Sequence, residues 1–105
     1  MHVQLVTFEL KDMSQAEYER FCDEVAPAFA AVPGLVSKVW LASPEANTFG
    51  GVYTFRDKKA FDAYVASDLF QGVGANPHLA QLKAADYEVM ERPTAVTRGL
   101  PLARA

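Results

Sequence analysis

Several residue types that define specialised protein classes are scarce in this sequence. Among its 105 residues there is one cysteine, Cys22, which can form no disulfide within the chain and has no second thiol for a metal site. The two histidines, His2 and His78, do not stand at the spacing of metal ligands with Cys22. We therefore predict that no metal is bound and that Cys22 is a small buried apolar residue.

Clusters of charge and long apolar runs are also missing. The 10 basic and 13 acidic residues give a net charge of -3 and are spread along the chain, whereas nucleic-acid binding needs clustered cations. No stretch of about 18 apolar residues is present to span a membrane, and the amino terminus has no signal-peptide pattern. Gly50-Gly51 and Gly72-Val73-Gly74 do not link a strand to a helix as a phosphate-binding loop does. These absences predict a cytoplasmic domain without nucleic acid, membrane or cofactor.

The first part of the chain contains a strand pattern followed by a helix pattern. Val3 to Leu10 alternates in the manner of a strand. Ser14 and Glu17 fit a helix capping box, and apolar residues then recur at steps of three and four. Pro27 predicts a kink in this helix or a break into a second short segment, and Pro33-Gly34 ends it.

The rest of the chain reads as a hairpin, a short helix and a last strand. Leu35 to Ala42 and Gly51 to Arg56 are β-branched and aromatic runs joined by a turn-rich loop. Asp57 is placed to cap the second helix. Gln71 to His78 is predicted to be a loop or one irregular turn, and Gln81 to Glu91 the last strand, which Pro93 closes.

The order of these segments, βαββαβ, predicts an α+β domain of ferredoxin-like fold over residues 1–93, with two helices on one face of a four-stranded antiparallel sheet. In the first strand Val3 and Leu5 oppose Val6 and Phe8, so both faces of the sheet are apolar. Two short helices can cover only one face, and the other predicts an interface. We expect a homodimer joined through its sheet faces, with a tail of residues 94–105 that is flexible or lies on the partner chain.

The predicted hairpin gathers aromatic and basic side chains on one face. If Ala42 pairs with Gly51, Trp40 lies opposite Tyr53, and Lys38 follows on the same face. A tryptophan and a tyrosine beside a cation can bind a flat aromatic molecule and donate hydrogen bonds to its oxygens. The alternative is that Trp40 and Tyr53 belong to the core or the dimer interface and that Lys38 extends into solvent.

Three segments resemble the YdhR-type monooxygenase family: Lys38-Val39-Trp40, Gly50-Gly51-Val52-Tyr53-Thr54-Phe55, and Asp57-Lys58-Lys59. The resemblance continues through Pro33-Gly34-Leu35 and the second helix, up to about Pro93. It implies a dimeric α/β-barrel protein related in fold to the antibiotic biosynthesis monooxygenases, which oxidise polycyclic aromatic substrates without metal or flavin.

The function implied by this resemblance is that of a cofactor-independent monooxygenase acting on a small aromatic, quinol-like or polyketide-type molecule. In this hypothesis Lys38 and Tyr53 stabilise a substrate anion, and His78 is the base, because its ordinary pKa suits proton abstraction. Trp40 and Tyr64 form aromatic walls. The alternatives are that His78 is a solvated loop residue, and that the protein is a non-catalytic dimeric binding protein for a small hydrophobic ligand.

Two further aromatic residues, Phe21 and Phe61, lie on the predicted helix faces, where they either pack in the core or line a substrate pocket. A haem-degrading role is known elsewhere in this fold, with an asparagine on the first strand. The first strand of this sequence offers Gln4 and Thr7 but no asparagine, which argues against that role.

Overall fold

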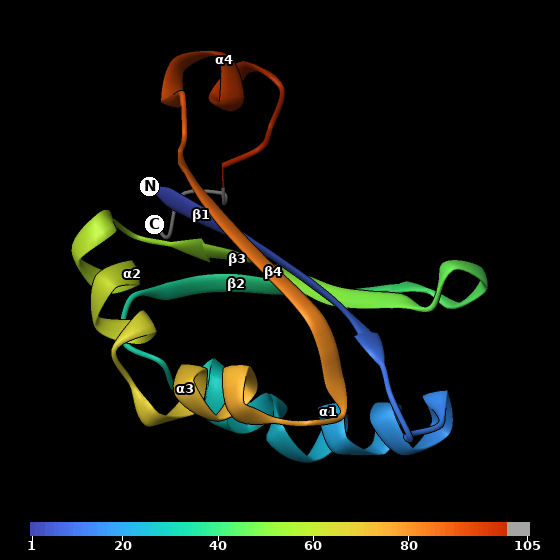
Figure 1. The fold of residues 1–105 in the computed structure, drawn as a ribbon. Coiled ribbons are helices and arrows are strands. Elements are labelled where there is room, and N and C mark those ends of the chain that lie inside the picture. The colour runs from blue at the N-terminus through green and yellow to red at the C-terminus, as the bar shows by residue number, and fades with distance from the viewer. Residues whose placement is uncertain (101–105) are drawn as a thin grey trace.

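The computed structural model describes residues 1–100, and its strands form one four-stranded antiparallel sheet in the order β2-β3-β1-β4 (Figure 1). Along the chain the elements are β1 (His2–Leu10), α1 (Gln15–Ala30), β2 (Leu35–Ser43), the 3-10 turn η1 (Pro44–Ala46), β3 (Thr48–Phe55), α2 (Lys58–Val65), α3 (Asp68–Ala75), β4 (Leu79–Glu88) and α4 (Glu91–Val96). The predicted ferredoxin-like α+β fold is confirmed, with α2 and α3 together where one second helix was expected. None of the helices in the described part of the chain is long and apolar enough to cross a membrane.

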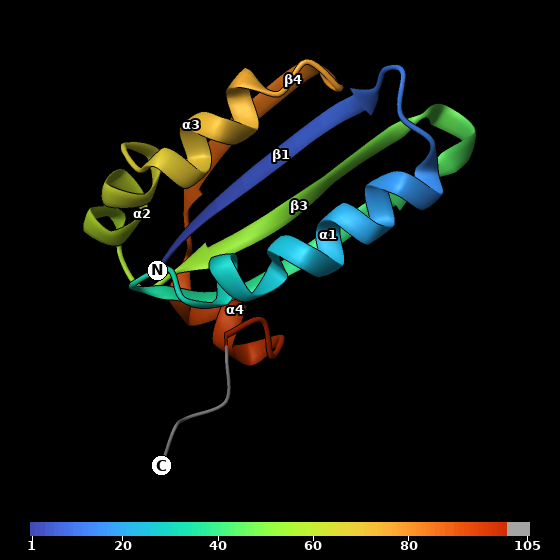
Figure 2. The same ribbon diagram turned by 90° about the horizontal axis from the view of Figure 1, so that it is seen from below.

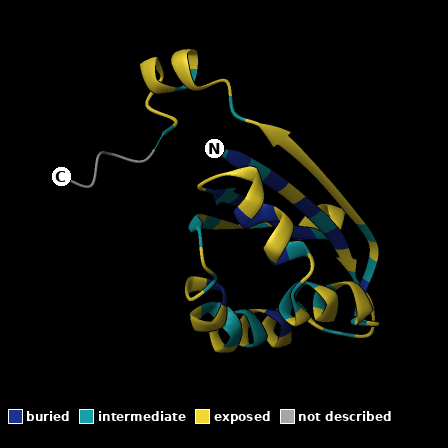
Figure 3. Cartoon of the chain, turned by 90° about the vertical axis from the view of Figure 1, so that its left-hand side faces the viewer, coloured by how far each residue is buried: buried dark blue, intermediate teal, exposed yellow. Residues whose placement is uncertain are grey.

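The main helices all lie on one face of the sheet (Figures 1 and 2). Seen from below, α1 runs along one side of this face and α2 with α3 along the other, with β1 and β3 between them. Figure 3 shows the buried residues concentrated on β1 and β3, with others on the inner sides of α1 and α2, whereas most of β4 and α4 is exposed. The core consists mainly of aromatic side chains: Phe8, Tyr18, Phe29, Phe49, Tyr53, Phe55, Phe61 and Tyr64, with Val6, Ala60 and Leu79.

The opposite face of the sheet is bare and apolar. Leu5 of β1 pairs with Val52 of β3, which pairs with Val39 of β2, so these three side chains form one row across the sheet. Leu5 is 39% exposed and Val39 55% exposed, although neither carries a polar group. In the next row Val3 pairs with Tyr87 of β4, which is 57% exposed. The apolar second face expected from the strand alternation is therefore present and uncovered in the single chain.

Helix α1 begins at the predicted capping box and continues past its proline. The backbone nitrogen of Glu17 donates to Ser14 Oγ at 3.1 Å, and Ser14 nitrogen donates to Glu17 Oε1 at 2.8 Å. Pro27 lies inside one continuous helix rather than starting a second segment. Because Pro27 is exposed, its ring projects to solvent and the freed carbonyl of the preceding turn can be hydrated.

The segment expected to be a loop at Gln71 to His78 is mostly helical, and that prediction was wrong. Ser67 Oγ accepts the backbone N–H of Phe70 and caps α3. Its two glycines do not break the helix: a side chain on Gly72 or Gly74 would meet nothing within 4 Å. The partly buried Leu69, Phe70 and Val73 instead anchor one face of α3 on the core.

The end of the chain also differs from the prediction. Strand β4 begins at Leu79 and ends at Glu88, and Pro93 lies inside α4 instead of closing the strand. Helix α4 therefore crosses the boundary expected between residues 93 and 94, and it stands beyond the end of β4, away from the other helices (Figure 1). Residues 101–105 of the expected tail lie outside the described residues.

The β2–β3 hairpin has a register two residues away from the one expected. Ala42 pairs with Phe49, Trp40 with Gly51 and Lys38 with Tyr53. The loop is shorter than the sequence suggested because η1 and Asn47, at φ 47°, close the turn directly between Ser43 and Thr48. Since a shift by two residues keeps every side chain on its original face, Lys38, Trp40 and Tyr53 still share the face toward the helices.

Candidate functional site

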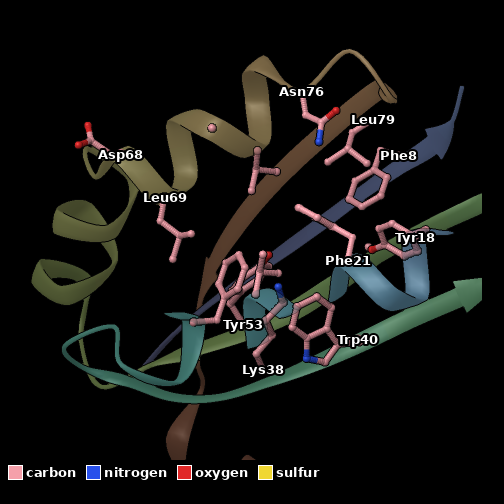
Figure 4. A pocket seen from close by; sticks show the side chains of 15 residues that line it. Phe8, Tyr18, Phe21, Lys38, Trp40, Tyr53, Asp68, Leu69, Asn76 and Leu79 are labelled. Carbon is pink, nitrogen blue, oxygen red and sulfur yellow. The ribbon is translucent and has the colours of Figure 1, made fainter. Parts of the chain in front are cut away.

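A cavity of about 300 Å³ lies between the covered face of the sheet and the helices (Figure 4). Strands β1, β2 and β3 form its floor, α1 forms one wall, and α3 forms the other. It is lined by Phe8, Tyr18, Phe21, Val25, Phe29, Lys38, Trp40, Gly50, Tyr53, Asp68, Leu69, Gly72, Val73, Asn76 and Leu79. A largely apolar and aromatic lining with a few polar groups is typical of small-molecule sites.

Two glycines shape the floor of this cavity. A side chain on Gly50 would lie 1.9 Å from the carbonyl oxygen of Val6, so only glycine lets β3 approach β1 so closely. The missing side chain of Gly51 leaves room for Lys38, because an added Cβ would lie 3.2 Å from Lys38 Cε. One glycine therefore permits the close approach of two strands, and the other makes space for the Lys38 side chain.

The amine of Lys38 is held in a cage of aromatic rings. Its Nζ lies 3.4 Å from the ring centroid of Phe29, 3.4 Å from that of Trp40, and 4.6 Å from that of Tyr53. Such contacts favour the ammonium form. Burial acts in the opposite direction and lowers the pKa of Lys38 from 10.5 to about 7, while the nearby Cys22 raises it slightly. The lysine can therefore either accept or donate a proton near neutral pH.

The tyrosines of the site remain protonated at neutral pH. Burial raises the pKa of Tyr53 to about 12, despite the opposing influence of Tyr64. The pKa of Tyr18 is raised further, first by burial and then by its interaction with Cys22. Each hydroxyl is consequently a hydrogen-bond donor and not a base, so Lys38 is the cavity group whose pKa lies near 7.

Four of the seven predicted site residues line the cavity: Lys38, Tyr53, Trp40 and Phe21. Tyr64 does not, because it is only 2% exposed and packs behind Tyr53, with ring centroids 5.6 Å apart. Phe61 lies deeper, between Phe55 and His2, with ring centroids 5.6 Å and 4.8 Å away. The reason is that α2 ends at Val65 and packs on the core, while α3, which the sequence analysis took for a loop, forms the wall.

His78 lies between α3 and β4, outside the residues that line the cavity. Its Nδ1 is 2.8 Å from the carbonyl oxygen of Lys11, and its backbone N–H donates to Asn76 Oδ1 at 2.9 Å. Because a carbonyl only accepts, Nδ1 must donate, and this bond ties the ring to the backbone of Lys11. The role of His78 as a base stays a prediction that the geometry does not favour.

The sequence analysis missed Asn76 as a site residue. It caps the carboxyl end of α3, and because its Oδ1 accepts the N–H of His78, its amide nitrogen is the group left to donate. Figure 4 shows that nitrogen on the side of the cavity. No sequence signal marked Asn76, because the segment had been assigned to a loop. Phe29 and Tyr18 were detectable as apolar helix positions but not as cavity walls.

Within residues 1–100, no group of three or more His, Cys, Asp or Glu side chains is arranged to hold a metal ion. The lining of the site offers one amine, one carboxylate (Asp68), hydroxyl and amide donors, and aromatic surfaces. Such groups can bind a flat aromatic molecule, transfer a proton to or from it, and stabilise a negative charge on its oxygen.

One protein family matches this chain over nearly its whole length. The sequence model of the family described as "Putative mono-oxygenase ydhR" matches residues 3–100. The chain belongs to this family. The match to the ydhR family extends beyond Pro93, which was the limit of the resemblance found in the sequence. A comparison with curated proteins gave no match.

Solved structures of similar fold include one protein described as a monooxygenase, one described as an oxygenase and one described as a heme-degrader. One is a "putative antibiotic biosynthesis monooxygenase" from Deinococcus radiodurans, with a TM-score of 0.72 and 19% identity over 87% of this chain and 94% of that one. Another is SnoaB, a cofactor-independent oxygenase from Streptomyces nogalater, with a TM-score of 0.67 and 22% identity over 86% and 94%. A third is the heme-degrader MhuD from Mycobacterium tuberculosis, solved with two hemes bound, with a TM-score of 0.69 and 19% identity over 86% and 96%. At these identities the likeness establishes the fold of this ydhR family member.

Proposed function

We propose that this protein is a cofactor-independent monooxygenase that oxidises a small phenolic or quinol-like aromatic molecule in the cavity between sheet and helices. The observation that carries the proposal is the amine of Lys38, which lies against Phe29 and Trp40 in an aromatic cavity. Membership of the ydhR family and the similarity of fold to SnoaB support the class of reaction.

Binding of the substrate rests on the shape and composition of the cavity. Trp40 and Phe21 on one side and Leu69 and Val73 on the other present apolar surface to a flat ring. The ring gains contact area and loses contact with water, which favours binding without any charge. Its hydroxyl is expected to point to Lys38, because Lys38 is the basic group among the lining residues.

The chemistry begins with proton transfer. The neutral amine of Lys38 accepts the proton of the phenolic hydroxyl, and the ammonium that results stabilises the phenolate by direct ion pairing. The Tyr53 hydroxyl, held protonated by burial, donates a second hydrogen bond. The electron-rich ring then reacts with dioxygen. One oxygen atom enters the ring as a carbonyl and the other leaves as water, with all electrons supplied by the substrate.

This assignment differs from the hypothesis drawn from the sequence, in which His78 was the base. Lys38 is preferred because it lines the cavity and His78 does not. In this mechanism one residue both removes the proton and stabilises the anion, two tasks that the sequence analysis had divided between His78 and Lys38.

Oxygen uptake with a three-ring substrate such as anthrone tests the proposal. Wild-type protein should consume dioxygen and produce anthraquinone, and Lys38→Met should reduce the rate by about 100-fold, the usual contribution of a general base. Exposed Lys59 offers a matched control, and Lys59→Met should leave the rate unchanged. Equal rates for wild type and Lys38→Met would refute the role of Lys38, and no uptake with any phenolic substrate would refute the oxygenase.

We further propose that the protein works as a homodimer joined through its bare sheet faces. The support is the row formed by exposed Leu5 and Val39 with half-buried Val52 between them, together with exposed Tyr87, an apolar surface that a second copy of the same sheet would cover.

The second candidate function is that of a non-catalytic binding protein for a small hydrophobic ligand. It is favoured by the lining of the cavity, which is mostly apolar and would hold such a ligand without any reaction. Tight binding of anthrone without oxygen uptake would support this candidate over the oxygenase.

A further inference from the structure

The Lys38 amine has properties that proton transfer does not require. Among residues 1–100, no carboxylate lies within ion-pair distance of Lys38 Nζ. The side chain crosses the space left by Gly51 and ends between two aromatic rings. An amine in such surroundings is a nucleophile as well as a base, because no carboxylate partner among the described residues holds it in the ammonium form.

The surroundings of Lys38 also favour a particular partner for this nucleophile. The cavity admits a flat aromatic body, and Lys38 stands on its floor beside the Tyr53 ring. A carbonyl attached to an aromatic ring would be brought to the amine by the same apolar contacts that bind the ring.

We infer that Lys38 is a covalent capture site for aromatic aldehydes, which it binds as an imine. The lone pair of Nζ adds to the carbonyl carbon, and the carbon–oxygen double bond opens to a carbinolamine. The oxygen then leaves as one molecule of water together with both hydrogens of the amine, and a carbon–nitrogen double bond remains. No electrons are lost or gained, so no oxidant or reductant is needed.

Burial of the amine adds support, because it lowers the pKa of Lys38 to about 7 and so leaves a large fraction of free base at neutral pH. The titratable groups that line the cavity or lie near the amine are Tyr18 and Cys22 of α1, Tyr53 of β3 and Asp68 of α3. Burial raises the pKa of both tyrosines and of Cys22, so all three are neutral at pH 7 and do not compete as bases.

This inference uses the cavity of the proposed function but not its reaction, so the two can fail separately. Capture needs no dioxygen, and oxygen uptake needs no covalent bond to lysine. Labelling of Lys38 without oxygen uptake would support the capture site and refute the oxygenase. Oxygen uptake without labelling would support the oxygenase and refute the capture site.

The test is reductive trapping of 2-naphthaldehyde with sodium cyanoborohydride near neutral pH, followed by intact-mass measurement and peptide mapping. Hydride from the reductant adds to the imine carbon and leaves a stable secondary amine on the lysine. We expect one naphthylmethyl group per chain on Lys38, with a labelling rate about tenfold or more above that of any exposed lysine. Naphthalene, which has the same ring system but no carbonyl, should compete for the cavity and slow this labelling.

Three variants separate the capture site from general lysine reactivity. Lys38→Met removes the amine, and Lys38→Arg keeps a cation that forms no imine, so both should lose the fast label. Lys59→Met should retain it. Labelling spread equally over the lysines, labelling confined to the amino terminus of Met1, or labelling of Lys38 that naphthalene does not slow would each overturn the inference.

Discussion

Replacing Lys38 by methionine should change how the stability of the protein depends on pH. Methionine keeps the unbranched apolar stem but removes the amine. The pKa of Lys38 is lowered from 10.5 in an unfolded chain to about 7 in the folded one. Between these values the unfolded state binds a proton that the folded state does not, so the contribution of Lys38 to the free energy of unfolding rises with pH. Below about pH 7 both states are protonated, and the burial of the charge costs stability in full.

The magnitude follows from the same linkage. Over the two pH units above 7 the rise is at most about 2 kcal/mol, and we expect roughly 1 kcal/mol because Lys38 is partly exposed and its charge is partly screened. Lys38→Met should therefore be more stable than wild type at pH 6, and this advantage should shrink by about 1 kcal/mol between pH 7 and pH 9.

The assay is urea unfolding of both proteins at several pH values and at one fixed protein concentration, which keeps the mass-action effect of protein concentration the same in every measurement. Trp40 is the one tryptophan of the chain, and its ring lies 3.4 Å from Lys38 Nζ. Its fluorescence reports unfolding. In the native wild type the fluorescence should also change with pH as Lys38 loses its proton, with a midpoint near pH 7. A lowered pKa of Lys38 would be refuted if the free energy of unfolding of the two proteins changed in parallel with pH and Trp40 fluorescence did not change near pH 7.

Three further predictions concern the base, the floor of the cavity and the bare face. His78→Ala should retain anthrone oxidation within a few-fold, since His78 does not line the cavity, and complete loss of turnover in a folded variant would return the role of base to His78. Gly50→Ala should lower the free energy of unfolding in urea by about 3 kcal/mol or more, because the new Cβ would lie 1.9 Å from a backbone atom. The control Gly72→Ala, whose new Cβ would contact nothing, should raise it by about 0.5–1 kcal/mol. A Gly50→Ala protein as stable as wild type would contradict the close approach of β3 to β1. Val39→Lys places a charge on the bare sheet face and should sediment as a folded monomer. The control Val96→Lys, at an exposed site on α4, should stay dimeric. A dimer of Val39→Lys would exclude the sheet face as the interface.

Much of the fold was predictable because it depends on local and periodic signals. The alternation in β1, the Ser14 and Glu17 capping box and the Asp57 cap each act within a few residues, and the structure contains all three. The apolar second face followed from the same alternation. The errors arose where packing overrides propensity: Gly72 and Gly74 indicated a loop, yet the apolar side of α3 holds these residues in a helix on the core.

The candidate site likewise has features that the sequence predicts and features that it does not. The sequence by itself determined that Lys38, Trp40 and Tyr53 share one face of the sheet, because strand periodicity fixes the face whichever of the two registers holds. Only the tertiary structure decided that Phe29 of α1 closes the cage around the amine, that Gly51 leaves space for it, and that His78 lies outside the cavity. These are contacts between segments distant in the sequence, and the pKa of Lys38 depends on the burial they produce, which no local pattern encodes.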